Sequence, residues 1–330
     1  MDALTKIKEK ARAKKRRVVL PEGTEPRVLQ AATKIIAERI ASVTLLGEER
    51  EIDRLAKEYG LNLNGVEIIN PERSGYYNDF VAEFILMRRA KGVTEQQAKT
   101  AMAAPLYFGA MLVRHDQADA SVAGSINTTG DVLRAGIQVL GLKKGIRTVS
   151  SCFLMTIPKY RDEVNKVFLY ADGAVVPNPN SGQLASIAVS TAQTMRNLLE
   201  MEPKIALLSF STKGSAQHED VDKVRKALDI LKRDHPELKV DGEFQVDAAI
   251  VPEVAKRKAP DSEIAGHANI LIFPDLDAGN IAYKLTERLA GATATGPIIQ
   301  GLAKPANDLS RGCSADDIVD VTAIAMLMRG

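Results

Sequence analysis

The chain has little of several features that mark specialised classes of protein. Its 330 residues include two cysteines, Cys152 and Cys313, no tryptophan and 5% aromatic residues. Two cysteines cannot form a disulfide framework, which favours a reducing, cytoplasmic location. No apolar run approaches the roughly 20 residues that span a bilayer, so we expect no membrane association. The 44 Lys and Arg against 42 Asp and Glu leave a net charge of +2, which argues against a nucleic-acid partner.

Signature motifs of the common nucleotide and metal enzymes are also missing. The chain contains no G-x-G-x-x-G, G-x-x-x-x-G-K-[ST], H-E-x-x-H or G-x-S-x-G segment. These absences argue against dinucleotide and nucleotide triphosphate loops, a zinc protease site and a nucleophile elbow. The four histidines are scattered, and none has the spacing of metal ligands. We therefore expect no metal site, and chemistry that relies on Ser, Asp, Arg and backbone amides.

What the chain does contain is an alternation of short apolar runs with amphipathic stretches. The β-branched runs bounded by turn residues predict strands at 17–20, 42–46, 66–69, 118–123, 148–157, 166–176, 204–210, 244–250 and 269–273. Helical spacing of apolar residues predicts helices at 27–37, 51–58, 94–112, 184–199, 220–232, 281–289 and 315–328. This order predicts an α/β protein with parallel sheets and helices on their faces.

Two segments place glycine and hydroxyl residues after a predicted strand, where anions bind well. In segment 124–134, Thr128 and Asp131 have the spacing of a capping box, the free amides of a helix start favour an anion, and Arg134 adds a guanidinium. The alternative is a capped turn with a surface arginine. Segment 209–215 contains hydroxyls, a lysine and a glycine, which suit phosphate. Its alternative is an ordinary polar loop.

Two charged clusters have simple structural interpretations. Asp275 and Asp277 follow a predicted strand, and we favour capping of the next helix over metal binding. The basic residues in 87–92 would attract a polyanion, although such clusters are more often a solvated helix end. The capping-box spacing of Thr94 and Gln97 predicts a new helix directly after them.

The most informative segment is 304–317. Ser310 and Arg311, followed by a glycine, form a turn that offers a hydroxyl donor and a guanidinium fork. A helix begins near Ser314, and Asp317 follows three positions later, which is again the spacing of a capping box. One interpretation has Asp317 cap its own helix. The other has an oxyanion or phosphate at Ser310 and Arg311 with a carboxylate base close by.

Seven stretches in chain order match a known family, and the last is the most specific: LPEGTEPRVLQAA, RRAKGVTEQQA, TTGDVLRAGIQVLG, SFSTKGSA, DGEFQVDAAIVPEV, HANILIFPDLDAGNIAYKL and GPIIQGLAKPANDLSRGCSADDIV. From about residue 17 to the C-terminus, the chain resembles the phosphate acetyltransferase (phosphotransacetylase) family, as a short form of the phosphate acetyl/butyryltransferases.

The resemblance implies two α/β/α domains with largely parallel sheets and an interdomain cleft, as in isocitrate and isopropylmalate dehydrogenases. We expect residues 1–143 with 297–330 to form the first domain, which carries the Ser-Arg-Asp site and the substrate arginines. Residues 144–296 would form the second domain and complete the cleft. The family, usually homodimeric, transfers an acetyl group reversibly between acetyl phosphate and coenzyme A in acetate metabolism. It uses no metal or cofactor, and coenzyme A is a substrate.

The resemblance also assigns roles to residues. The family's catalytic serine, arginine and aspartate fall on Ser310, Arg311 and Asp317, and its further substrate-binding arginines fall on Arg88 and Arg134. Other candidates for substrate binding are Thr128, Thr129, Ser211 and Lys213. We expect the aspartate to deprotonate the thiol of coenzyme A, the serine to stabilise the carbonyl oxygen and the arginine to hold the phosphoryl group. Transfer would be direct, in a ternary complex, rather than through an acyl group on Cys313.

Three alternatives remain open. A phosphate butyryltransferase would run the same chemistry on a longer acyl chain, although the KPANDLSRGC context is closer to the acetyl enzymes. A hydroxy-acid dehydrogenase would share the implied fold, but we identify neither its metal-binding aspartates nor a nicotinamide site. A non-catalytic acyl-coenzyme A sensor is disfavoured by the intact Ser310, Arg311 and Asp317.

Overall fold

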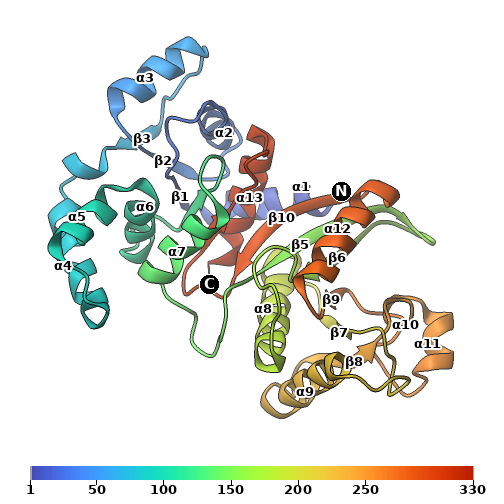
Figure 1. Cartoon of the computed structure of the whole chain (residues 1–330). Helices are drawn as coiled ribbons and strands as arrows, with labels where there is room; N and C mark the ends of the chain where they lie inside the picture. The colour runs from blue at the N-terminus through green and yellow to red at the C-terminus, as the bar shows by residue number, and fades with distance from the viewer. Residues whose placement is uncertain (1, 330) are drawn as a thin grey trace. The chain divides into compact units, whose positions relative to one another are not determined.

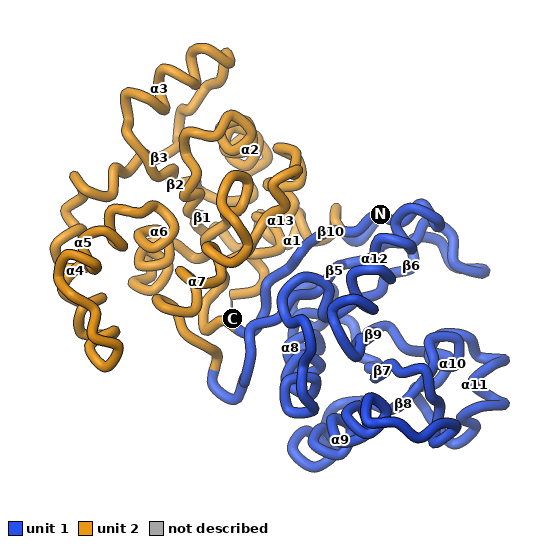
Figure 2. The backbone as a smooth tube through the Cα atoms, in the orientation of Figure 1, with its two compact units in different colours: residues 1–3, 144–301 blue, residues 4–143, 302–330 orange. Residues whose placement is uncertain are grey.

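The computed structural model describes residues 2–329 and divides into two compact units (Figure 2). One, here called the N-terminal unit, comprises residues 4–143 and 302–329, and the other, the central unit, comprises residues 2–3 and 144–301. Each unit is built around one β-sheet with helices packed on it (Figure 1). The chain therefore returns to the N-terminal unit for its last segment.

The strands of the N-terminal unit form a parallel sheet in the order β11-β4-β1-β2-β3. They are β1 (Arg17–Leu20), β2 (Ser42–Leu46), β3 (Val66–Ile69), β4 (Ala120–Ala123) and β11 (Ala306–Asp308). Every residue of β4 and β11 is buried. Such short, fully buried strands are typical of a parallel sheet that is covered on both faces.

The helices of the N-terminal unit lie before, between and after its strands in the chain. They are α1 (Ala3–Lys14), α2 (Pro26–Ala37), α3 (Glu49–Glu58), α4 (Tyr77–Arg88), α5 (Glu95–Ala103), α6 (Pro105–Arg114), α7 (Thr129–Val139) and α13 (Ala315–Met328), with short 3₁₀ turns at Pro71–Arg73 and Arg89–Lys91. Helices α2 and α13 pack on each other and on the strands, and so do α6 and α7. In Figure 1 the two pairs lie on either side of the sheet.

A topological switch point lies between β1 and β4. From β1 the chain continues to β2 and β3 on one side, and it later returns to β4 and β11 on the other side. The segments that follow β1 and β4 therefore separate from each other at the carboxyl edge of the sheet. Open α/β sheets bind their ligands at such points.

The central unit has a mixed sheet in the order β10-β5-β6-β9-β7-β8. Its strands are β5 (Ser150–Tyr160), β6 (Glu163–Ala171), β7 (Lys204–Leu208), β8 (Lys239–Phe244), β9 (Ile270–Ile272) and β10 (Thr293–Gln300). Strands β10, β5 and β6 pair antiparallel, and the remaining pairs are parallel. Its helices are α8 (Ser181–Leu199), α9 (Glu219–Asp234), α10 (Val246–Ile250), α11 (Pro252–Lys258) and α12 (Leu276–Ala290).

The predicted α/β class with largely parallel sheets is confirmed, but two predicted elements are wrong. The predicted helix 94–112 is two helices, because Pro105 begins α6 and its ring prevents α5 from continuing. The predicted strand 244–250 shares only Phe244 with the observed β8, and Val246–Ile250 form the short helix α10. The antiparallel hairpin of β5 and β6 was also not predicted; it turns at Arg161, which adopts a φ of 54°. None of the helices within residues 2–329 is long and apolar enough to cross a membrane.

Candidate active site

Three segments leave the carboxyl edge of the sheet in the N-terminal unit. They follow β1, β4 and β11 and comprise residues 21–25, 124–128 and 309–314. Since these three strands are consecutive neighbours in a parallel sheet, the segments emerge at the same edge. Ser310 and Arg311 belong to the third segment. The predicted catalytic turn therefore lies at the edge where this fold class binds ligands.

Ser310 and Arg311 lie on an exposed turn. The amide of Cys313 donates to the carbonyl oxygen of Ser310 at 2.9 Å, and the amide of Gly312 donates to the Ser310 hydroxyl oxygen at 3.2 Å. These bonds close the turn and leave the hydroxyl hydrogen available to a substrate. Within residues 2–329, the guanidinium of Arg311 makes no hydrogen bond or ion pair. The turn thus presents a hydroxyl donor beside an unpaired guanidinium.

Asp317 lies in the first turn of α13 and closes a capping box with Ser314. Its Oδ2 atom accepts from the amide of Ser314 at 2.8 Å and from the Ser314 hydroxyl at 2.9 Å. The capping interpretation of Asp317 is therefore confirmed. No group in the described part of the chain donates to its Oδ1 atom, and the residue is exposed. Capping occupies one carboxylate oxygen and leaves the other open to substrate.

Arg27, near the start of α2, ties the turn to the neighbouring segments. Its guanidinium donates to the carbonyl oxygens of Arg311 at 2.8 Å, of Cys313 at 2.9 Å and of Ser125 at 3.0 Å. Its Nε atom donates to Glu25 at 2.6 Å. Because the donors of a guanidinium have a fixed planar geometry, this one side chain sets the spacing between the turn after β11 and the segment after β4.

Glu22 joins the segment after β1 to the segment after β4, across the switch point. Its carboxylate is 4% exposed and accepts from the amides of Gly124, Ser125, Ile126 and Asn127 and from the side chains of Ser125 and Asn127. Burial alone would raise the pKa of Glu22, but the hydrogen bonds from Ser125 and Asn127 outweigh it and lower the pKa below its ordinary value. These amides, which precede the helix start at Thr129, are therefore satisfied by the protein itself.

Helix α7 begins with two of the threonines predicted to bind substrate. Thr128 is its N-cap, accepting from the amide of Asp131 at 3.2 Å and donating to the Asp131 carboxylate at 2.7 Å. The Thr129 hydroxyl donates to Asp308 at 2.6 Å. Arg134 donates to Asp131 at 2.7 Å, and its side chain is 58% exposed. Both hydroxyls therefore have carboxylate partners, whereas Arg134 remains accessible to an anion.

A pocket of about 430 Å³ opens beside the switch point. Its wall is mostly apolar and comes from the segments after β1, β2 and β4 and from the start of α6. The polar members of the wall are Glu22, Thr24, Tyr107, Asn127, Asp131 and Arg134. An apolar pocket with a few polar groups is the usual form of a small-molecule site, and this volume suits one portion of a large substrate.

The positive charges of Arg88 and Arg134 both influence the pKa of Tyr107, which lies in this wall. Burial raises the pKa of Tyr107, and the positive charges of Arg134 and Arg88 act in the opposite direction. Arg88 ends α4, and its Nε atom is buried without a hydrogen-bond partner among residues 2–329. The two arginines predicted to bind substrate therefore come from different helices to the same region.

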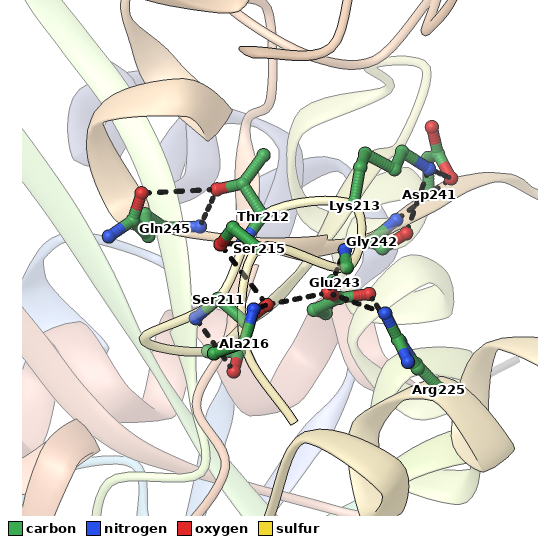
Figure 3. A network of polar contacts seen from close by, with 12 residues as sticks. Ser211, Thr212, Lys213, Ser215, Ala216, Arg225, Asp241, Gly242, Glu243 and Gln245 are labelled. Carbon is green, nitrogen blue, oxygen red and sulfur yellow. Dashed lines mark hydrogen bonds and ion pairs between the residues drawn. The ribbon is translucent and has the colours of Figure 1, made fainter. Parts of the chain in front are cut away.

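Ser211 and Lys213, also predicted to bind substrate, lie in the central unit and belong to a closed polar network (Figure 3). The Ser211 hydroxyl donates to Glu243 at 2.8 Å, and the Lys213 ammonium donates to Asp241 at 2.6 Å. Glu243 is 2% exposed and also accepts from Arg225 at 3.0 Å. The hydroxyl and the ammonium that we expected to bind phosphate therefore already have carboxylate partners.

Two further candidates resolve to structural roles. Asp275 caps α12 by accepting from the amide of Ala278 at 2.8 Å, which is the interpretation favoured from its sequence position. Cys313 is 6% exposed, and burial raises its pKa to about 11, so its thiol stays protonated at neutral pH. Within residues 2–329, no three His, Cys, Asp or Glu side chains come together as metal ligands would.

Sequence reasoning missed two residues that organise this edge, Glu22 and Arg27. Both lie in the stretch LPEGTEPR, where a short apolar strand is followed at once by charged residues. Charges placed directly after a buried strand need partners, because burying an unpaired charge is costly. That juxtaposition is the signal from which both residues could have been found.

Residues 2–326 match the sequence profile of the phosphate acetyl/butaryl transferase family. The chain belongs to this family. A phosphate acetyltransferase from Thermoanaerobacterium thermosaccharolyticum is 51% identical over 323 residues, which cover 98% of each chain. The crystal structure of a phosphotransacetylase from Streptococcus pyogenes superposes with a TM-score of 0.93 at 40% identity and covers 99% of this chain and 98% of that chain.

A 4-hydroxythreonine-4-phosphate dehydrogenase from Klebsiella pneumoniae has a TM-score of 0.56 at 11% identity, covers 96% of this chain and 100% of that chain, and shares the fold alone. Membership of the phosphate acetyl/butaryl transferase family, predicted from the seven stretches, is confirmed. For a member of this acyltransferase family, the exposed turn supplies two groups suited to an acyl phosphate. Ser310 offers a hydroxyl donor, and Arg311 offers a planar guanidinium fork.

Proposed function

We propose that this protein transfers an acetyl group reversibly between acetyl phosphate and coenzyme A. The relative at 51% identity is a phosphate acetyltransferase, and its match covers nearly all of both chains. The observation that carries the proposal is the exposed turn in which the Ser310 hydroxyl and the unpaired Arg311 guanidinium stand seven and six positions before Asp317, whose carboxylate keeps one open oxygen. A hydroxyl, a guanidinium and a carboxylate are the groups that this reaction needs.

Asp317 is the proposed general base. A free thiol has a pKa of about 8.5, so only a small fraction is thiolate at neutral pH. A carboxylate beside the sulfur removes this limit and contributes roughly 10²–10⁴-fold to the rate. The Oδ1 atom of Asp317 is suited to this role, because the capping bonds from Ser314 hold the carboxylate in place through Oδ2 alone.

Ser310 and Arg311 act on the acetyl phosphate. The thiolate attacks the acetyl carbon, a C–S bond forms, the bond from carbon to the phosphate oxygen breaks, and phosphate leaves. Negative charge grows on the carbonyl oxygen, where the Ser310 hydroxyl donates. Arg311 binds two phosphoryl oxygens, which orients the acyl phosphate and stabilises the departing phosphate.

Arg134 and Arg88 bind the anionic parts of coenzyme A near the apolar pocket. Arg134 is exposed in the pocket wall, and Arg88 acts on the same tyrosine. Thr128, Thr129, Ser211 and Lys213 also belong to the proposed substrate set, and each, like Arg134, has a protein carboxylate partner. Transfer is direct, because the buried thiol of Cys313, with its pKa of about 11, is a poor acyl acceptor.

Three further properties belong to the same proposal. Coenzyme A is a substrate, and the reaction uses no cofactor, since the groups described above supply every proton and charge that it needs. The protein acts in the cytoplasm, where its two unpaired cysteines remain reduced. It assembles as a homodimer, which sedimentation of the purified protein would test.

The test is an assay of thioester absorbance with coenzyme A and acetyl phosphate in the presence of a metal chelator. We expect acetyl-coenzyme A to accumulate, and phosphate to drive the reverse reaction. Butyryl phosphate serves as the matched comparison, and we expect it to react more slowly. Folded protein that forms no thioester from acetyl phosphate would disprove the proposed function, and a preference for butyryl phosphate would correct the substrate.

A further inference from the structure

A buried carboxyl group lies directly beneath the candidate catalytic turn. Asp308 is the last residue of β11, pairs in register with Ala123 of β4 and is 1% exposed. Only Leu309 separates it from Ser310. At this depth the side chain cannot touch a substrate, so any part that it plays in the reaction must act through other residues.

Asp308 connects β11 to the start of α7 through a single donor. Its Oδ2 atom accepts from the hydroxyl of Thr129, the first residue of α7, at 2.6 Å. Its Oδ1 atom is buried without a hydrogen-bond partner of normal geometry among residues 2–329, and the amide of Leu309 offsets that burial only in part. A buried carboxyl oxygen left in this state is costly, and proteins retain such groups where they serve a function.

The backbone after β4 is shaped to admit this carboxyl group. Gly124 adopts a φ of +117°, and a Cβ atom at this position would lie 2.4 Å from Oδ1 of Asp308. Only glycine therefore fits, both for its conformation and for the close approach. The same glycine donates its amide to Glu22. Asp308 is thus built into the junction of the segments that follow β1, β4 and β11.

One neighbouring charge acts on Asp308. Glu22, on the segment after β1, is the titratable group that faces it within the described residues. Its other neighbours are neutral: Thr129 on α7, Gly124 after β4 and the amide of Leu309. Burial first, and then the charge of Glu22, raise the pKa of Asp308 to about 6, against the hydrogen bond from Thr129. The group therefore changes its charge close to neutral pH.

We propose that Asp308 is a positioning residue for acetyl transfer, whose ionised carboxylate, bound to Thr129, holds the Ser310–Arg311 turn against the first turn of α7. This inference rests on the proposed function of that turn. The carboxylate is the better acceptor for the Thr129 hydroxyl. Protonation weakens that bond and adds a buried hydroxyl that needs an acceptor of its own. A misplacement of reacting groups by about 1 Å can cost 10²-fold in rate.

The experiment measures kcat and KM for acetyl transfer between about pH 5 and 9 in the parent protein and three variants. In the parent we expect kcat to fall as the pH drops through about 6. Asp308→Asn resembles the protonated acid, so its kcat should be at least about tenfold lower at alkaline pH and should lose this step. The KM for coenzyme A should stay within about threefold, since the side chain does not reach substrate.

Thr129→Val and Thr129→Ser give a readout that a purely structural role would not move. The valine variant removes the donor that favours the carboxylate, so the acidic step in kcat should move to higher pH. The serine variant keeps a hydroxyl and should return the step to its parental position. If Asp308→Asn does not fold, the valine and serine pair decides the question alone.

The matched control lies at the other edge of the same sheet. Thr44 of β2 donates to Glu67 of β3 at 2.7 Å, which is the same hydroxyl-to-carboxylate pairing. Glu67→Gln should keep the parental kcat and pH profile. A parent without any thioester formation would reject the proposed function. If the parent is active but Asp308→Asn or Thr129→Val keeps the parental pH profile, only the role of Asp308 is overturned.

Discussion

The guanidinium of Arg27 donates to the carbonyl oxygen of Arg311 at 2.8 Å, although 284 positions separate the two residues in the chain. The side chain of Arg311 is exposed, whereas its backbone is held in place by hydrogen bonds from Arg27. This arrangement separates two tasks: one guanidinium fixes the turn, and the other remains available for a substrate anion. The predictions below follow from this division.

Replacing Arg27 should impair turnover more than substrate binding. Arg27→Gln removes the bonds to Arg311, Cys313 and Ser125, so the turn loses its spacing and kcat should fall roughly 10–100-fold. Steady-state kinetics check this. Arg12→Gln is the matched control, because Arg12 also donates to a carbonyl and a carboxylate, both of Glu38, but on α1. Equal losses in both variants would contradict the positioning role.

Replacing Asp317 should remove the base while keeping the helix cap. In Asp317→Asn the side-chain oxygen still accepts from Ser314, so α13 should remain folded, and kcat should fall at least about 10²-fold. Asp316→Asn is the control on the neighbouring position, where the carboxylate pairs with Lys34 at 2.6 Å. Kinetics with circular dichroism separate lost chemistry from lost structure, and an Asp317→Asn variant with normal kcat would rule out the base assignment.

Replacing Arg311 should weaken the binding of acetyl phosphate and of phosphate. Arg311→Gln should raise the KM for acetyl phosphate and for phosphate by about tenfold or more and lower kcat, because the fork that binds phosphoryl oxygens is lost. Arg311→Lys keeps the charge without the fork and should recover only part of the loss. Full recovery by lysine would mean that charge alone matters there.

Replacing Cys313 should leave the chemistry in place. Its thiol is buried, and its pKa is raised to about 11, so Cys313→Ala should keep kcat within about tenfold of the parent. Incubation with labelled acetyl phosphate alone should leave no acetyl group on the protein. Stoichiometric labelling of the parent, absent in the alanine variant, would demand a covalent intermediate.

Asp308 should also give a pH-dependent stability. In the folded protein the Asp308 carboxyl group keeps its proton up to about pH 6, whereas in the unfolded chain it releases the proton near the ordinary aspartate pKa of 3.8. The folded state therefore loses relative stability as the pH rises through this window, by about 3 kcal/mol. Asparagine does not titrate, so Asp308→Asn lacks this loss. In urea unfolding, the free energy of unfolding of the variant minus that of the parent should therefore be larger at pH 8 than at about pH 4. A constant difference would contradict the raised pKa.

Sequence patterns predicted those parts of the fold that depend on local periodicity. Strand 17–20 and strand 42–46 were predicted with the bounds that the structure has. The helix expected over 94–112 failed because its apolar spacing continues through Pro105, whose ring ends one helix and begins the next. The strand expected over 244–250 failed because its apolar residues fit either period over so short a run.

The site was predictable in its motifs but not in its internal partners. The Ser310–Arg311 turn and the cap at Asp317 follow from residue order, since both are local. The partners of Glu22, Arg27 and Asp308 lie about 100 to 300 positions away, so no local pattern contains them. Such contacts form only once the sheet has brought its strand ends together.

The carboxylate of Glu22 has one more consequence. At the switch point of many α/β proteins, backbone amides bind the phosphate of a nucleotide. Here the Glu22 carboxylate of the same chain already accepts hydrogen bonds from these amides. In the proposed site, arginine side chains bind the incoming anion, and single substitutions can change these without altering the main chain.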